Sequence, residues 1–304
     1  MNRSLVMGAG LIGRPLAERL AARGDSVTIA TRSGSTAIGA TTRVLDAADP
    51  TAFTIAATDA STIFLCTNPP YTDWAAQWPP VIDAALAAAS VTGARLVVMG
   101  NLYPYGSPIG PMTEHSPEIT TESKGLIRRA GWAKLRAAQA SGQIQAVEVR
   151  ASDYFGPGAT GTAHLGESFF TAVLRSKTAR VVGLPRVEHS WSYLPDIVTT
   201  LIAAAEYPGD WGRIWHVPSS TFSRTEIARQ LNTHYGVQGR VSGYPQWVLR
   251  TIGAFNPVMR EVWASSYQFL MPFVIESAET QQELGVTATP WETALITTAD
   301  SYRR

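Results

Sequence analysis

The chain has 304 residues, of which 45% are hydrophobic and 16% charged, a composition typical of a folded globular protein. Its 25 lysines and arginines nearly balance its 24 aspartates and glutamates, and the sequence has no basic run or stripe, so we expect no binding to nucleic acid or to an anionic membrane surface. The single cysteine, Cys66, excludes an internal disulfide and a cysteine-based zinc cluster, and the five histidines lack metal-ligand spacing. We therefore expect a cytoplasmic protein with a small-molecule partner, no nucleic acid, no membrane and no metal.

The first half of the sequence alternates short apolar runs with segments of helical periodicity. This alternation predicts βαβ units, which right-handed crossovers assemble into a parallel sheet covered by helices. We expect strands at residues 5–7, 27–30, 43–45, 62–66, 96–99 and 146–149. We expect helices at residues 12–22, 79–89 and 124–140. The predicted fold class is α/β, a Rossmann-type doubly wound parallel sheet with its ligand crevice at the carboxyl ends of the strands.

The residue pattern of the sequence changes after Arg150, where glycines and scattered aromatic residues follow. We predict a dinucleotide-binding domain over residues 1–152 and a smaller C-terminal substrate domain over residues 153–188 and 218–304. Residues 189–217 are expected to pack back on the first domain. Within them, residues 192–205 predict a helix that the chain enters through Pro195 and Asp196. A second helix is expected at 165–174. The aromatic residues between 244 and 275 are expected to pack in a core or a lid.

A glycine-rich turn joins the first predicted strand to the first predicted helix. Gly8, Gly10 and Gly13 form a G-x-G-x-x-G pattern, in which Leu11 and Ile12 lie between the second and third glycines. The first glycine makes the tight turn, the second lets a pyrophosphate approach the backbone, and the third allows close packing of helix on strand. The coincidence of strand, turn, helix and second strand predicts a dinucleotide site, whereas the glycines alone would be weak evidence.

The second predicted strand ends in Thr31, Arg32 and Ser33, where an NAD-binding protein would carry an acidic side chain for the adenosine ribose. A guanidinium with two hydroxyls suits a 2′-phosphate instead, so NADP(H) is the predicted cofactor and NAD the less favoured one. The alternative is that Arg32 is a solvated turn residue.

Three further residues follow the next strands and complete the predicted cofactor site. Asp46 comes after the third strand and is a candidate for the adenine edge. Thr67 and Asn68 come after the fourth and would lie beside the ribose and the nicotinamide.

Further segments, in order along nearly the whole chain, resemble the extended or atypical branch of the short-chain dehydrogenase/reductase superfamily, often labelled NAD-dependent epimerase/dehydratase. They are residues 104–106 (Pro-Tyr-Gly), 123–125 (Ser-Lys-Gly), 150–158, 189–198, and 283–285 with Pro290. In that family a serine or threonine, a tyrosine and a lysine carry out the chemistry. The lysine lies four residues after the tyrosine, lowers the phenol's pKa and holds the nicotinamide ribose.

This sequence departs from the family pattern at two of those three positions. Lys124 fits the lysine, but Thr120 stands at the tyrosine position and Asn101 at the hydroxyl position. Threonine cannot exchange a proton near neutral pH as an activated phenol can. We therefore consider Tyr103, slightly favoured, and Tyr105 as substitute acids, with Asn101 as a hydrogen-bond donor to a carbonyl.

The remaining candidates for the catalytic groups come from the predicted substrate side. They are Asp153, Tyr154, His164, His189 and Tyr193. For each of them, packing or solvent exposure is the simpler explanation.

Three functions are compatible with these observations. The first is an NADP(H)-dependent oxidoreductase acting on a small carbonyl, enone or sugar-like substrate, with Lys124 anchoring the cofactor. The second is a non-redox epimerase, dehydratase or cyclase on the same fold, and the third is a catalytically inactive NADP-sensing protein. The chain is expected to be a monomer or a homodimer, because helices 79–89 and 124–140 resemble the pair that forms a dimer interface in relatives.

Overall fold

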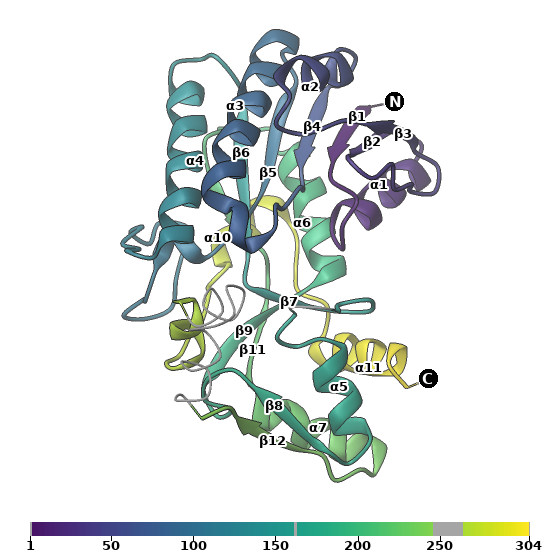
Figure 1. Cartoon of the computed structure of the whole chain (residues 1–304), viewed down its shortest axis with the longest axis vertical. Helices are drawn as coiled ribbons and strands as arrows, with labels where there is room; N and C mark the ends of the chain where they lie inside the picture. The colour runs from purple at the N-terminus through teal and green to yellow at the C-terminus, as the bar shows by residue number, and fades with distance from the viewer. Residues whose placement is uncertain (1, 161–162, 246–263, 304) are drawn as a thin grey trace.

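The computed structural model describes residues 2–160, 163–245 and 264–303. Its central layer is a seven-stranded sheet in the order β10-β6-β5-β4-β1-β2-β3, in which every neighbouring pair is parallel (Figure 1). The strands are β1 (Arg3–Met7), β2 (Ser26–Thr31), β3 (Thr41–Val44), β4 (Thr62–Leu65), β5 (Arg95–Asn101), β6 (Ala146–Ala151) and β10 (Ile214–His216). From β1 the chain adds β2 and β3 on one side of the sheet and then β4, β5, β6 and β10 on the other. This change of side at β1 and β4 confirms the predicted doubly wound α/β fold.

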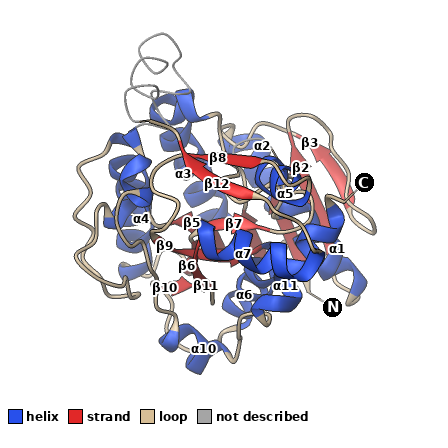
Figure 2. Cartoon of the chain, turned by 90° about the horizontal axis from the view of Figure 1, so that it is seen from below, coloured by secondary structure: helices blue, strands red, loops and turns tan. Residues whose placement is uncertain are grey.

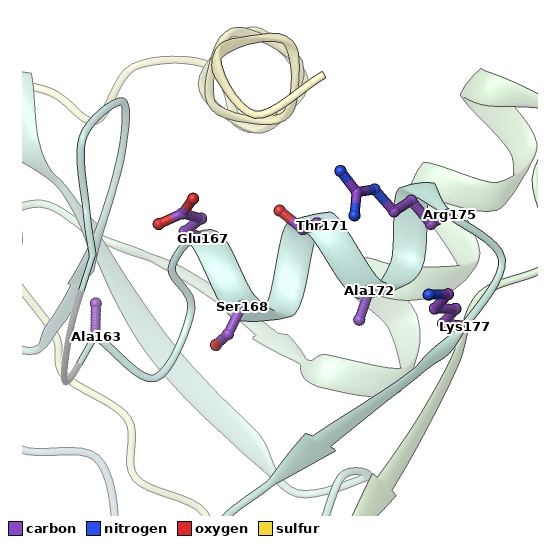
Figure 3. A pocket seen from close by; sticks show the side chains of 7 residues that line it. All are labelled: Ala163, Glu167, Ser168, Thr171, Ala172, Arg175 and Lys177. Atoms are coloured by element: carbon purple, nitrogen blue, oxygen red, sulfur yellow. The ribbon is translucent and has the colours of Figure 1, made fainter. Parts of the chain in front are cut away.

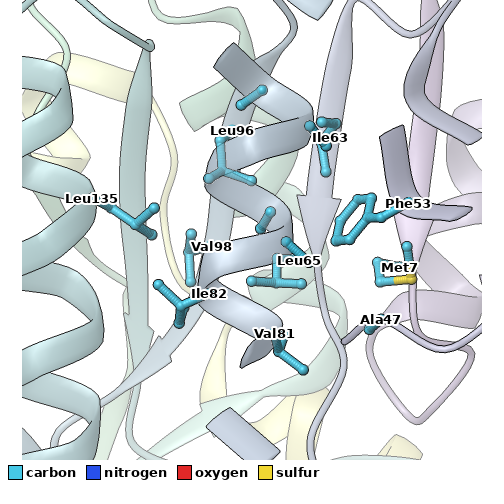
Figure 4. Packing of buried hydrophobic residues seen from close by; sticks show 14 of the residues in the cluster. Met7, Ala47, Phe53, Ile63, Leu65, Val81, Ile82, Leu96, Val98 and Leu135 are labelled. Atoms are coloured by element: carbon cyan, nitrogen blue, oxygen red, sulfur yellow. The ribbon is translucent and has the colours of Figure 1, made fainter. Parts of the chain in front are cut away.

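Helices cover both faces of this sheet, and the alternation of side chains along each strand explains why. In β1, Leu5 and Met7 lie in one apolar cluster while Val6 lies in the other. The first cluster packs beneath α2 (Pro50–Ala57), α3 (Trp74–Thr92) and α4 (Ser123–Ala140), and Figure 4 shows part of it. The second packs beneath α1 (Gly13–Ala22) and α6 (Leu194–Glu206). Strands buried on both faces need continuous apolar runs, which is what the sequence provides.

The rest of the chain forms a smaller unit with two short sheets, drawn below the central sheet in Figure 1 and seen from below in Figure 2. One sheet has the order β11-β9-β7 and the other pairs β12 with β8. The strands are β7 (Asp153–Phe155), β8 (Thr178–Val181), β9 (Glu188–Tyr193), β11 (Ser220–Ser223) and β12 (Arg240–Gly243). Its helices are α5 (Glu167–Leu174), α7 (Arg224–Tyr235) and α11 (Trp291–Ser301), whereas α10 (Ala278–Leu284) packs against α6 and β10 of the larger unit.

Residues 189–217 are divided between the two units. Their first part, in β9, belongs to the smaller sheet, whereas α6 packs on the central sheet and β10 extends it by pairing with β6. Three aromatic residues of the 244–275 region, Trp247, Phe255 and Trp263, lie outside the described residues. Within the described ranges no helix is long and apolar enough to cross a membrane, and no group of three or more acidic, histidine or cysteine side chains could hold a metal ion.

Helix α3 begins at Trp74, five residues before the predicted start at 79, although Pro79 and Pro80 lie inside it. The prolines remove backbone donors, but buried tryptophans anchor the added turn. The Trp74 indole N–H donates to the Pro69 carbonyl at 3.0 Å, and Trp78 is 2% exposed. Helix α2 was not predicted. It begins at the cap residue Asp49, which accepts hydrogen bonds from the amides of residues 51 and 52.

The buried histidine of β10 makes the stability of this fold sensitive to acid. His216 has no exposed surface, its Nδ1 lies 2.8 Å from the Glu276 carbonyl, and its Nε2 lies 2.8 Å from the Tyr105 hydroxyl. Burial lowers the pKa of His216 to about 4. The folded protein therefore keeps this ring neutral while the unfolded chain takes up a proton below its ordinary pKa of about 6.5.

We expect the free energy of unfolding to fall as the pH drops from about 6.5 towards 4, with His216 contributing about 2 to 3 kcal/mol of that loss. His216→Gln keeps a donor and an acceptor but does not titrate, so its denaturation midpoint should depend less steeply on pH in this window. The exposed His234 on α7 supplies the control, as His234→Gln. An unchanged pH slope in the His216 variant would contradict the assignment.

Candidate active site

The glycine-rich turn occupies the space between β1 and α1. Gly8 has a φ of +105°, a conformation that side chains disfavour, and its amide donates to the Ala30 carbonyl at 2.8 Å. A Cβ atom at Gly13 would lie 1.9 Å from the Gly8 carbonyl oxygen, so α1 can pack this closely only with glycine there. A Cβ at Gly10 would meet nothing within 4 Å. Space is therefore open in front of Gly10, at the helix end that favours anions.

The end of β2 carries a hydroxyl cluster next to an exposed arginine. The Thr31 hydroxyl accepts from the Ser35 amide at 3.1 Å and lies 3.4 Å from the Ser33 hydroxyl. Arg32 is exposed and takes part in none of the ion pairs formed by the described residues. Asp46, also exposed, accepts from the Ala48 amide at 3.0 Å. This corner can offer one permanent positive charge and two hydroxyls to a ligand.

The loop after β4 lies against the same glycine turn. The Thr67 amide nitrogen is 2.8 Å from the position that a Cβ of Gly8 would take, which places Thr67 directly beside the turn. Asn68 follows it and is exposed. Leu11 faces the loop of the smaller unit, because a Cβ at Gly158 would lie 3.9 Å from the Leu11 side chain.

Lys124 lies in the first turn of α4 and is only 2% exposed. Its ammonium nitrogen is 3.9 Å from a carboxylate oxygen of Glu122, and the other oxygen of that carboxylate caps the helix by accepting from the Gly125 amide at 2.9 Å. The same ammonium lies 5.1 Å from the centre of the Tyr71 ring. A buried cation is thus held against an aromatic face, an attractive arrangement when both groups are desolvated.

Tyr71 and Tyr103 form a pair of phenols beside Lys124. Their hydroxyl oxygens are 2.5 Å apart. Tyr103 lies in the one-turn helix η2 (Tyr103–Tyr105) after β5, and its carbonyl would be 2.5 Å from a Cβ at Gly125, so it packs directly on the start of α4. Tyr71 lies in another one-turn helix, η1 (Tyr71–Asp73), after β4. The sequence analysis missed Tyr71, for which the only signal was its place in a loop after a strand's carboxyl end.

Thr120, which the sequence analysis matched to the family's tyrosine, is closely packed between neighbouring segments. Thr120 is 3% exposed, and its hydroxyl would be 2.2 Å from a Cβ at Gly125. A Cβ at Gly106 would lie 2.8 Å from its Cα. The Thr120 hydroxyl accepts from the Glu122 amide at 3.3 Å, which gives it a local structural contact.

The other two sequence candidates near β5 also contact protein groups. Asn101 ends the strand, and its side-chain oxygen accepts from the Tyr103 amide at 3.2 Å. Tyr105 is 1% exposed and donates to Nε2 of His216, whose Nδ1 must carry the proton because it faces a carbonyl. Burial raises the pKa of Tyr105 to about 12, in spite of the Arg150 guanidinium 4.8 Å from its ring centre.

A second set of titratable groups lies in the smaller unit. A carboxylate oxygen of Asp153 is 2.8 Å from Nε2 of His189, and Nδ1 of the same ring is 3.2 Å from the Gln268 carbonyl. Both ring nitrogens of His189 therefore face oxygen acceptors. Burial alone would raise the pKa of Asp153, but the hydrogen bond from His189 and nearby positive charge hold it below its usual value.

Burial also changes the proton affinity of the neighbouring sequence candidates. It lowers the pKa of His164 to about 4 and raises the pKa of Tyr154, with Asp153 adding to the latter shift. Tyr193 packs instead in the apolar core of the smaller unit, with its ring centre 5.2 Å from that of Phe155.

Two hollows of the surface are lined by none of the predicted cofactor residues and by neither phenol of the Tyr71–Tyr103 pair. One, of about 410 Å³, lies along α5 and is lined by hydroxyl and charged side chains including Ser168, Thr171 and Arg175 (Figure 3). The other, of about 390 Å³, lies between α3 and α4 and is mostly apolar. Trp132 of α4 is 2% exposed at this groove, whereas Ala133 and Ala137 on the same helix face solvent.

Solved structures similar to this one share its architecture over almost the whole chain. UDP-glucose 4-epimerase from Thermotoga maritima, in complex with UDP-glucose, has a TM-score of 0.80 and 13% identity, covering 99% of this chain and 98% of that one. UDP-glucuronic acid 4-epimerase from Bacillus cereus, in complex with NAD, has a TM-score of 0.77 and 14% identity, with coverage of 99% and 98%.

A third structure is a double mutant of the dTDP-glucose 4,6-dehydratase DesIV from Streptomyces venezuelae with NAD bound. It has a TM-score of 0.78 and 17% identity, with coverage of 100% and 97%. At these identities the likeness concerns the fold.

The sequence itself places the chain within a family. No curated protein matches it. Residues 4–217, however, match the model of the NAD dependent epimerase/dehydratase family, and they include the glycine turn, both phenols and Lys124. Since this match spans well over half of the 304 residues, the chain belongs to the NAD dependent epimerase/dehydratase family.

Proposed function

We propose that the protein is an NADP(H)-dependent oxidoreductase of the extended or atypical short-chain dehydrogenase/reductase type that acts on a small carbonyl, enone or sugar-like substrate. The observation that carries this proposal is the cluster of buried Lys124 with the phenols of Tyr71 and Tyr103. It joins a fixed positive charge to proton-exchanging groups, as carbonyl reduction requires.

In this proposal, different residues of the chain bind the cofactor and protonate the substrate. A bound nicotinamide would supply or accept hydride, while Gly8, Gly10 and Gly13 admit its pyrophosphate and Lys124 holds its ribose. A phenol would protonate the substrate oxygen, and Tyr103 is the phenol that the sequence favours. The hydrogen bond from Tyr105 to His216 supports a structural role for Tyr105.

A non-redox epimerase, dehydratase or cyclase is the second candidate, favoured by the family to which the chain belongs. Such an enzyme would regenerate its cofactor in every cycle. NADPH absorbance at 340 nm, followed with a panel of aldehydes, ketones, enones and nucleotide sugars, separates the two. Net NADPH loss supports the oxidoreductase, whereas product formation at constant NADPH supports the second candidate. Tight NADPH binding with neither result would support the NADP-sensing alternative.

The adenosine corner predicts a preference for NADPH over NADH. Arg32 offers a charged fork for a 2′-phosphate, and no carboxylate at the end of β2 repels it. Arg32→Ala should weaken NADPH binding by about 10- to 100-fold, the value of a charge-assisted pair, and leave NADH binding almost unchanged. Fluorescence titration with both cofactors measures this, with Arg136→Ala on exposed α4 as control. Equal losses for the two cofactors would remove the argument.

The glycine turn allows cofactor binding to be separated from folding. A methyl group at Gly10 meets no protein atom within 4 Å, so Gly10→Ala should keep the wild-type melting temperature while it obstructs the pyrophosphate. Gly13→Ala places a Cβ 1.9 Å from the Gly8 carbonyl and should destabilise the fold as well. Thermal unfolding with and without NADPH checks both variants. A Gly10 variant that NADPH stabilises as strongly as wild type would contradict the site.

Lys124 is expected to contribute to both cofactor affinity and turnover. Lys124→Met removes the charge and keeps the length of the buried side chain, so NADPH binding should weaken by about tenfold, as for the loss of one hydrogen bond from a charged donor. Lys134→Met, at an exposed position of the same helix, is the matched control. NADPH affinity and turnover that both remain at wild-type values would overturn the role of Lys124.

A further inference from the structure

We propose that Tyr71 is the phenol that exchanges the proton with the substrate oxygen, and that Tyr103 is a positioning residue that donates a hydrogen bond to it. The proposal rests on the proposed reduction of a carbonyl. It places the acid in the loop after β4 rather than four residues before Lys124, where the family pattern has its tyrosine.

The contact with Lys124 distinguishes Tyr71 from the other tyrosines. The ammonium lies 5.1 Å from the centre of the Tyr71 ring, and no other described tyrosine has a lysine over its ring. In the family pattern the lysine acts on a tyrosine one helical turn earlier, but Thr120 at that position is packed against Gly125. The positive charge of Lys124 therefore acts on a phenol that reaches it from another loop.

Tyr71 is held rigidly enough for this task. Trp74, three residues after Tyr71, is 3% exposed, and its indole N–H donates to the Pro69 carbonyl at 3.0 Å. This hydrogen bond joins the residues before and after Tyr71 and so fixes the loop. The Trp74 ring centre lies 5.2 Å from that of Tyr71 and 6.0 Å from that of Tyr103. Tyr71 itself is partly exposed, so a substrate can approach it.

The hydrogen bond between the two phenols gives them unequal roles. With the oxygens 2.5 Å apart, one hydroxyl donates and the other accepts. Burial raises the pKa of Tyr71 to about 12, and the bond with Tyr103 lowers it; burial raises the pKa of Tyr103 further, and the same bond adds to that rise. Either hydroxyl can donate in the neutral pair, but the Lys124 ammonium, 5.1 Å from the centre of the Tyr71 ring, favours the ionised form of Tyr71, and the Tyr103 hydroxyl then donates to that phenolate.

The proton and electron balance of the step closes with NADPH as the reductant. A bound NADPH would supply a hydride, whose electron pair would go to the carbonyl carbon while the C=O π pair moves to oxygen. The Tyr71 O–H bond breaks as a new O–H bond forms on the substrate. The resulting Tyr71 phenolate is stabilised by the Tyr103 hydroxyl and the Lys124 charge until a proton from water restores it.

The first experiment compares Tyr71→Phe, Tyr103→Phe and the control Thr120→Val, using the carbonyl of the panel that wild type reduces fastest. Tyr71→Phe should lower kcat by about 10² to 10⁴ while the NADPH dissociation constant changes little. Tyr103→Phe should lower kcat less and move the pH midpoint of the reverse, alcohol-oxidising reaction upward, because the phenolate loses its donor. Thr120→Val should behave as wild type. Full turnover by Tyr71→Phe together with its loss in Tyr103→Phe would overturn the proposal.

A second measurement does not depend on turnover. Tyrosine labelled with ¹³C at Cζ reports the ionisation of each phenol by NMR, and the two Phe variants assign the signals of Tyr71 and Tyr103 in the NADP⁺ complex. Tyr71 should titrate at the lower pH of the two, and Lys124→Met should raise its midpoint. Tyr103 titrating first would refute the inference. If wild type consumes no NADPH with any panel member, the oxidoreductase proposal fails, and the titration still decides which phenol ionises.

Discussion

The parallel direction of all seven central strands is the constraint on which the site depends. Their carboxyl ends meet at one edge, so loops distant in sequence converge there. The turn at Gly8, the hydroxyl corner at Thr31, the loop at Thr67 and the helix carrying Tyr103 all leave the sheet from this edge. A sheet with mixed strand directions would divide these groups between two opposite edges.

Buried charges fix the segment after β5 that carries Tyr103. The Arg150 guanidinium is fully buried and donates to a Glu148 carboxylate oxygen at 2.8 Å, and Arg128 lies 3.6 Å from the other oxygen. Gly100 is required beside them, since a Cβ there would lie 2.7 Å from Glu148. Arg150 also covers the face of Tyr105, whose hydroxyl is tied to β10. Breaking one member would leave an uncompensated buried charge, which is costly.

The start of α4 is closely packed around Thr120, four residues before Lys124. Gly125 allows Thr120 and the Tyr103 carbonyl to approach closely, and Glu122 caps the helix while staying near Lys124. In this packing the phenol next to Lys124 comes from β4's loop. In the proposed reaction the phenol comes from a different loop than the family pattern predicts, which is possible because a reaction requires a side chain's position in space and not its place in the sequence.

The sequence by itself determined the class of fold and the cofactor turn, because both follow from local patterns. Short continuous apolar runs predict buried strands, a 3.6-residue period predicts helices, and a glycine spacing predicts a turn. All six predicted strands are present, and α1 and α4 begin within one residue of their predicted starts. The start of α3 and the existence of α2 were not predicted, although the cap at Asp49 was a readable signal. Only the tertiary structure brought Tyr71 to Tyr103 and Lys124, or His189 to Asp153, because those contacts join segments far apart in the chain. No local pattern encodes such distances, since the packing of helices and strands onto one another sets them.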